Sequence, residues 1–301
     1  MIGKYSPYAL QLRETFQAMG NTAVIDAGDI EAFVCARDRL WELERRWSRF
    51  DPCSDISRLN SAEGATVAIS KDTALLLTYM KEARGVTNGL YDPTLLVAML
   101  KNGYGQSLSG FGVTVLPKSI LARGEISRIV VTENDGIWEA SLPVGTAVDP
   151  GGMGKGLATD IVAEELTREY RGGIGVAVAL GGDVRVIGVA RSIGIEHPYT
   201  RETIEHVFCA DGALATSGRW SKELVSGASH VVDPRTLAAP THSIVQVTVA
   251  AGSCVWAEAL ATACLVSGSF EIVDGLGIGA LAVRVDGSVT RSTYWKSGMH
   301  L

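Results

Sequence analysis

A glycine-rich segment that runs straight into a helical pattern constrains the fold more than any other feature of the chain. Residues 148–156 read Val-Asp-Pro-Gly-Gly-Met-Gly-Lys-Gly, and residues 157–170 then place Ile161, Val162 and Leu166 on one helical face. Small residues at a helix start let backbone N–H groups approach an anion, and Lys155 adds a positive point charge. The spacing matches neither the Walker A motif nor the GxGxxG dinucleotide fingerprint. The segment therefore indicates a phosphate or pyrophosphate site, with a tight strand-to-helix turn as the structural alternative.

Apolar periodicity divides the rest of the chain into helices and strands. Further helices are predicted over residues 29–50, 72–84 and 255–266, and strands over 126–132, 136–142, 175–180, 183–189, 230–233, 244–250, 280–284 and 288–294. In the second helix the residues expected to face inward are Ala74, Leu75, Leu77 and Met80. Residues 103–119 are rich in Gly and Ser and are predicted to form a loop. Because helices and strands are mixed without strict alternation, the predicted class is α+β.

Composition narrows the function classes. The chain has 301 residues, a net charge of −6 and 20% charged residues, so it carries no electrostatic footprint for nucleic acid or an anionic membrane. Its five cysteines are scattered without metal-ligand spacing, which suits reduced thiols and a cytoplasmic location. We see no signal peptide, and the apolar stretches fall short of the roughly 20 residues that span a bilayer. We therefore expect no membrane insertion and no nucleic-acid partner.

Two oxygen-bearing residues lie four positions apart in the last predicted helix. Glu258 and Thr262 share a helical face, and a carboxylate beside a hydroxyl can offer two oxygens to a hard cation such as Mg²⁺. The alternative is a solvated face with a local hydrogen bond. The neighbouring residues are apolar, however, and a lone charged group is costly to bury there without a partner.

The segments at residues 213–218 and 229–236 are rich in Thr, Ser, His, Asp and Arg and follow strand-like patterns. Ligand contacts concentrate in such loops. His230 could act as a general base, although a single His without an adjacent partner is more often structural. Asp233-Pro234 is also an ordinary way to start a turn, so both interpretations stay open.

Taken in order, these segments resemble the successive motifs of the ApbE-like family, the FAD:protein FMN transferases. The resemblance covers Met19 to the C-terminus. It rests on residues 18–20, 50–60, 89–94, 149–156 with Asp160, 180–183, 215–218, 230–236 and 257–262. It implies an α+β fold of mixed sheets with packed helices, an ApbE-like (T-fold-related) architecture. It also implies an N-terminal extension over residues 1–18 and a single FAD-binding catalytic domain over residues 19–301.

The same resemblance assigns roles to individual residues. The positions that match FAD-binding residues of the family are Met19, Phe50, Leu90, Tyr91, Asp92, Asp149, Lys155 and Val232. The metal positions match the backbone carbonyl of Gly152 and the side chains of Glu258 and Thr262, and the implied cation is Mg²⁺. Lys155 and His230 are the catalytic candidates. This chain departs from the family in having Glu258 where aspartate is usual and Pro150 where leucine is usual.

The function implied is Mg²⁺-dependent transfer of FMN from FAD to a Ser or Thr of a target flavoprotein, with release of AMP. Hydrolysis of FAD to FMN and AMP is an alternative, because water could replace the acceptor hydroxyl. A non-catalytic FAD-binding protein is the alternative from a different class. Many family members are exported lipoproteins, whereas we expect a cytoplasmic protein with an unknown acceptor.

Overall fold

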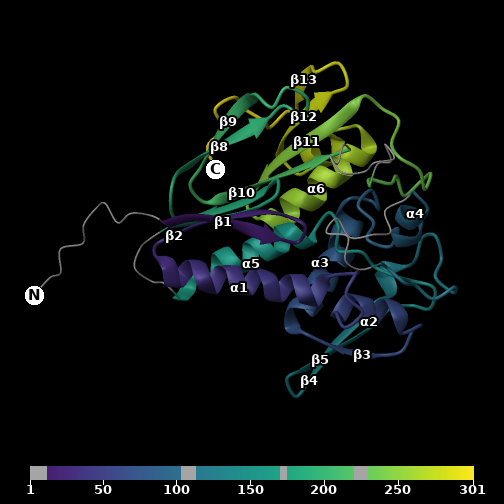
Figure 1. The fold of residues 1–301 in the computed structure, drawn as a ribbon. Coiled ribbons are helices and arrows are strands. Elements are labelled where there is room, and N and C mark those ends of the chain that lie inside the picture. Colours follow the sequence, from purple (N-terminus) through teal and green to yellow (C-terminus); the bar gives the residue numbers. More distant parts are fainter. Residues whose placement is uncertain (1–11, 103–112, 170–174, 220–229) are drawn as a thin grey trace, which may run out of the picture.

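The computed structural model describes residues 12–102, 113–169, 175–219 and 230–301 (Figure 1). Within these residues an eight-stranded sheet forms the centre, and every neighbouring pair of its strands is antiparallel. The strands lie side by side in chain order: β1 (Leu12–Ala18), β2 (Asn21–Ala27), β6 (Val176–Leu180), β7 (Asp183–Ile187), β10 (Gly212–Gly218), β11 (Ile244–Ala251), β12 (Gly279–Arg284) and β13 (Val289–Arg291).

Three helices cover one face of this sheet: α1 (Ile30–Trp47), α5 (Gly154–Glu169) and α6 (Cys254–Ser267). Helix α1 packs on α5 and on the β1–β2 hairpin, α5 packs on β6 and β7, and α6 packs on β10 and β11 (Figure 1). Strand β6 shows why the helices settle there, since its buried residues alternate as Val176, Val178 and Leu180. Helix α6 is buried on nearly all sides, and Glu258 is its one charged residue.

The opposite face of the sheet is covered by a separate hairpin. Strands β8 (Arg191–Glu196) and β9 (Thr203–Cys209) pair with each other and not with the main sheet. Together with Trp295 they bury Val186, Leu214 and Leu281, which point away from the helices. The sheet is thus sandwiched between a helical layer and a β-hairpin layer.

The segment between β2 and β6 contains α1 and α5 and also a smaller group of helices and strands. After α1 it forms α2 (Asp55–Ser61), α3 (Lys71–Val86), α4 (Leu96–Lys101), the 3-10 helix η1 (Ile126–Arg128) and a three-stranded sheet of β3 (Val67–Ile69), β5 (Ile137–Ser141) and β4 (Val130–Asn134). The β4–β5 turn has positive φ at Asp135 and Gly136, as a tight hairpin turn requires. A short helix, α7 (Glu271–Gly275), precedes β12.

Several predicted elements are confirmed and others are wrong. Helix α1 agrees with the predicted helix and starts where Asp29 accepts a hydrogen bond from the N–H of Ala32 at 2.9 Å. The strand predicted over residues 126–132 begins instead as η1, and no strand forms over residues 230–233. In α3, Leu76 is fully buried while Leu75, which was expected to face inward, is 40% exposed. Residues 103–112 of the predicted loop lie outside the described residues.

The sheet begins earlier in the chain than expected. Residues 12–18, which the sequence placed in an N-terminal extension, form β1 and pair along their length with β2. The division expected after residue 18 therefore falls at the turn of an edge hairpin of the sheet. None of the helices in the described parts of the chain combines the length and apolar character needed to cross a bilayer.

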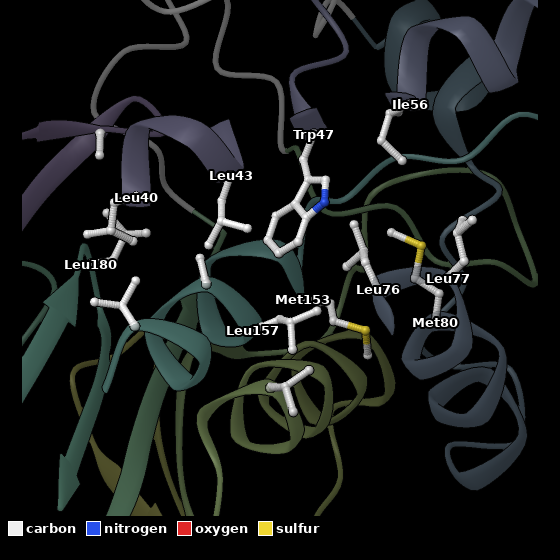
Figure 2. Packing of buried hydrophobic residues seen from close by; sticks show 14 of the residues in the cluster. Leu40, Leu43, Trp47, Ile56, Leu76, Leu77, Met80, Met153, Leu157 and Leu180 are labelled. Atoms are coloured by element: carbon white, nitrogen blue, oxygen red, sulfur yellow. The ribbon is translucent and has the colours of Figure 1, made fainter. Parts of the chain in front are cut away.

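The largest buried cluster joins α1, α3 and α5 (Figure 2). Leu40, Leu43 and Trp47 follow one another along α1: Leu40 lies beside Leu180, and Leu43 and Trp47 face Met153 and Leu157 at the start of α5. Trp47 also donates a hydrogen bond from Nε1 to the hydroxyl of Thr73 in α3 at 3.2 Å. The apolar stripe of α1 thereby fixes where the glycine-rich segment enters its helix.

Met153 tests this packing. Met153→Ala should lower the free energy of unfolding by about 2–5 kcal/mol, because truncating a fully buried side chain leaves a cavity between the helices. Leu75→Ala, on the exposed side of α3, should change it by less than about 0.5–1 kcal/mol. Urea denaturation of both variants measures the difference. Equal losses would contradict the placement of Met153 in the core.

Candidate active site

One cleft of about 1200 Å³ brings together every residue that the sequence assigned to a site. The cleft lies where the β1–β2 turn, the end of α1, the glycine-rich loop, strand β10 and helix α6 meet. Its lining includes Met19, Phe50, Leu90, Tyr91, Asp92, Asp149, Gly152, Lys155, His230, Val232, Glu258 and Thr262. Their proximity was expected from the resemblance alone, since the residues come from most of the length of the chain.

The glycine-rich loop is at once a tight turn and a wall of the cleft. The carboxylate of Asp149 accepts a hydrogen bond from the N–H of Gly151 at 3.1 Å, which bends the chain back on itself. Gly152 has φ of +80°, and a Cβ there would lie 3.1 Å from the Thr262 hydroxyl. Helix α5 then begins at Gly154, three residues earlier than predicted. Both interpretations of this segment, the turn and the ligand-facing loop, therefore describe the same geometry.

Lys155 is held in the cleft by two buried carboxylates. Its ammonium contacts Glu258 and lies 2.8 Å from Oδ2 of Asp183, the first residue of β7. Burial opposes the charged form of Lys155, but Asp183 and Glu258 outweigh this effect and raise its pKa. Burial raises the pKa of Asp183 to about 7, against the attraction of Lys155. When both carboxylates are ionised, the cluster of Asp183, Glu258 and Lys155 carries one net negative charge.

Carboxylates also join α5 to α6 at their N-termini. Glu258 of α6 accepts a hydrogen bond from the N–H of Gly156 in the first turn of α5 at 2.7 Å. Asp160 of α5 accepts hydrogen bonds from the N–H groups of Cys254 and Val255, which start α6, at 2.8 Å each. Burial raises the pKa of Asp160 to about 6, although these two donors favour its charged form. Each helix thus supplies the acid that satisfies the unpaired N–H groups of the other.

The oxygen atoms next to this cluster suit a hard cation. The Thr262 hydroxyl lies 3.2 Å from the hydroxyl of Ser217 and borders the backbone of Gly152 and the Glu258 helix face. Among the described residues no group of three His, Cys, Asp or Glu side chains could hold a metal. A set of one carboxylate with hydroxyl and carbonyl oxygens fits Mg²⁺, which keeps open positions for water and phosphate oxygens. It does not fit zinc, which takes mainly nitrogen and sulfur ligands.

The Tyr91 hydroxyl is a buried polar group at the cleft without a hydrogen-bond partner in the described parts of the chain. The side chain is 2% exposed. Burial, reinforced by the charges of Glu258 and Asp149, raises the pKa of Tyr91 well above its usual range, so the hydroxyl stays a donor. A buried hydroxyl without a partner is unfavourable unless a bound molecule or water satisfies it.

Sequence reasoning missed Arg49. Its side chain is buried, pairs with Asp149 at 3.0 Å, donates to the Thr114 hydroxyl at 2.9 Å and stacks on the Phe50 ring. Burial raises the pKa of Asp149, although Arg49 opposes this effect. A signal was present in the sequence, because Arg49 lies two residues after the end of α1 at Trp47 and directly precedes the candidate Phe50.

Asp92 lines the cleft, but its carboxylate is already occupied. Its side chain is fully buried, and it pairs with Arg84 at 3.3 Å and Arg123 at 3.0 Å. It also accepts a hydrogen bond from the Thr94 hydroxyl at 2.6 Å. In this structure Asp92 fixes the loop that carries Leu90 and Tyr91, and its charge is compensated within the protein.

His230 lies half-buried at the cleft near Lys155. Burial lowers the pKa of His230, and the positive charge of Lys155 lowers it further. The imidazole is therefore neutral at neutral pH and able to accept a proton. Residues 220–229, which precede it, lie outside the described residues.

The fold and the cleft define an α+β protein with a glycine-rich loop, a lysine and a carboxylate-hydroxyl pair at one site. Residues 16–277 match the model of the ApbE family, and the chain belongs to this family. A relative from Vibrio cholerae, named FAD:protein FMN transferase, is 31% identical over 255 residues, which cover 77% of this chain and 72% of the relative.

Solved structures agree with this membership. The ApbE protein of Thermotoga maritima superposes with a TM-score of 0.78 at 23% identity and covers 94% of this chain and 97% of its own. The flavin transferase ApbE of Vibrio cholerae superposes with a TM-score of 0.72 at 25% identity and covers 95% and 98%. The expected ApbE-like fold class is therefore confirmed.

The close approach of α5 and α6 can be tested at Gly156. A Cβ at this position would lie 2.5 Å from the carbonyl oxygen of Cys254, so Gly156→Ala must push the two helices apart. We expect a loss of about 1–3 kcal/mol or more in the free energy of unfolding.

Gly85→Ala in α3 is the matched control, because its Cβ would meet nothing within 4 Å. Removing that exposed helical glycine should stabilise the protein by about 0.5–1 kcal/mol. Chemical denaturation compares the two variants. Two variants of equal stability would show that α5 and α6 do not approach as described.

Proposed function

We propose that this protein transfers the FMN half of FAD to a Ser or Thr hydroxyl of a partner protein and releases AMP. The observation that carries the proposal is the convergence of Lys155, the glycine-rich loop, and the Glu258 and Thr262 oxygens in one cleft. The cleft volume of about 1200 Å³ exceeds the roughly 300–1,000 Å³ of ordinary small-molecule sites and suits a long dinucleotide. The Vibrio cholerae relative carries the name of this activity.

The lining of the cleft supports FAD as the ligand. Met19, Phe50 and Leu90 offer apolar surface for a flavin ring, and the Tyr91 hydroxyl offers a buried donor. Met19 and Gly20 have φ of +49° and +68°, as the tight turn between β1 and β2 requires, and this turn places Met19 at the cleft. Lys155 and the N–H groups of the glycine-rich loop would bind the pyrophosphate.

The chemistry we propose is an in-line displacement at the phosphorus of the FMN half. The acceptor hydroxyl oxygen bonds to this phosphorus, the bond to the bridging oxygen breaks, and AMP leaves with that oxygen. His230 accepts the hydroxyl proton on a ring nitrogen, and Lys155 compensates the charge on the phosphate oxygens. Glu258, Thr262 and the carbonyl of Gly152 would hold Mg²⁺, which supplies charge neutralisation at the phosphates when bound.

The group that receives FMN distinguishes transfer to a protein from hydrolysis of FAD by water and from binding of FAD without reaction. The purified protein would be incubated with FAD, Mg²⁺ and a candidate flavoprotein acceptor, and intact masses would be measured by mass spectrometry. We expect the acceptor to gain the mass of one FMN, and AMP to appear in equal amount. An acceptor with its Ser or Thr changed to Ala is the control and should gain nothing.

Free FMN and AMP without acceptor labelling would instead establish FAD hydrolysis. Intact FAD bound in the cleft, with no product after prolonged incubation, would favour a binding protein. Absence of FAD binding in a fluorescence titration would overturn all three possibilities.

His230 gives the proposal a pH signature. Because a base acts in its neutral form and the pKa of His230 lies below the ordinary 6.5, kcat/KM should stay level through neutral pH and fall only at more acidic pH. His230→Gln should lower kcat about 10²–10⁴-fold and remove this acidic limb. A variant that keeps both the rate and the limb would show that His230 is not the base.

A further inference from the structure

Asp183 is a buried carboxylate behind the cleft lining, between Gly182 and Val184, and the proposed reaction gives it no role. It is 1% exposed and begins β7, directly after the Gly181-Gly182 turn. Its Oδ2 lies 2.8 Å from Nζ of Lys155, whose side chain is 29% exposed toward the cleft. Since a buried charge needs a partner, the pairing with Lys155 explains why an aspartate is tolerated at this position.

Lys155 pairs with two carboxylates, Asp183 and Glu258, and Glu258 has further contacts that could compete for its charge. Glu258 also accepts the N–H of Gly156 at 2.7 Å and belongs to the oxygen set that fits a divalent cation. A cation bound at Glu258 would repel the ammonium of Lys155, because both carry positive charge. Asp183 begins β7 and has neither of these two roles, so it can hold the Lys155 ammonium whether or not a cation is bound at Glu258.

We propose that Asp183 is a positioning residue that anchors the Lys155 ammonium in the cleft, where Lys155 meets the phosphates of the bound dinucleotide. This inference rests on the proposed function. By holding Lys155 in place, Asp183 would strengthen the binding of an anionic ligand, although its own carboxylate is negatively charged. Simple charge repulsion predicts the reverse, namely that Asp183 opposes binding of FAD.

The opposite signs of these two expectations make the test decisive. FAD would be titrated into the full-length protein in EDTA, so that no metal-dependent turnover occurs, and binding would be followed by flavin fluorescence. Asp183→Asn should weaken FAD binding about tenfold, because Lys155 loses a charge-assisted contact and remains at Glu258. A variant that binds FAD as tightly as or more tightly than the unchanged protein would overturn the proposal.

A double-mutant cycle shows whether the effect passes through Lys155. Lys155→Met should also weaken FAD binding about tenfold. In that background the added Asp183→Asn change should cost less than about twofold, because there is no ammonium left to position. Equal losses in both backgrounds would mean that Asp183 acts independently of Lys155 and would overturn the proposal.

A conservative variant distinguishes a positioning role of Asp183 from a purely structural one. Asp183→Glu keeps the charge and should recover part of the FAD affinity that Asp183→Asn loses, which a purely structural role for this position would not explain. If Asp183→Asn does not fold, judged by circular dichroism, Asp183→Glu is compared instead with the unchanged protein and with Lys155→Met. An FAD affinity of Asp183→Glu between those of the two supports the anchor, and an affinity outside this range overturns it. If the unchanged protein binds FAD but Asp183 has no such effect, only this inference fails, whereas no FAD binding at all contradicts the proposed function.

Discussion

The contact between the N-termini of α5 and α6 is the interaction on which the rest of the site depends. Asp160 accepts both first N–H groups of α6, and Glu258 accepts the N–H of Gly156 in α5. Gly156 allows this approach because it has no side chain to meet the carbonyl of Cys254. The pairing fixes Lys155 and Glu258 relative to the glycine-rich loop, and Thr262 follows one turn after Glu258 on the same face of α6.

This arrangement also gives a physical account of Glu258. The resemblance to the family implied aspartate at this position, and glutamate is longer by one methylene. Glu258 uses its length to reach both Lys155 and the N–H of Gly156 across the helix interface. Its carboxylate is therefore satisfied within the protein, and a cation would share it with these two donors.

The sheet determines how distant segments of the chain reach the same cleft. Its eight strands lie in chain order, so the β1–β2 turn with Met19 and the β6–β7 turn with Asp183 become neighbours although more than half of the chain separates them. Asn21 contacts Gly181 at this junction, which aligns the two turns. The β8–β9 hairpin covers the other face of the sheet, and its strand β8 also lines the cleft with residues 193–196.

The sequence by itself determined the long helix, the late apolar helix and the glycine-rich turn, because each of these has a local signature in periodicity or residue type. Most of the residues that line the cleft were named through the resemblance to the family, because they carry no such local signature. It did not reveal β1, whose outward residues are polar and whose edge position leaves one side unpaired, nor the strands β8 and β9. It did not indicate that Asp92 is neutralised by Arg84 and Arg123, or that Arg49 pairs with Asp149. Only the tertiary structure decided these points, because ion pairs between distant residues and strand partners depend on contacts that local sequence patterns do not encode.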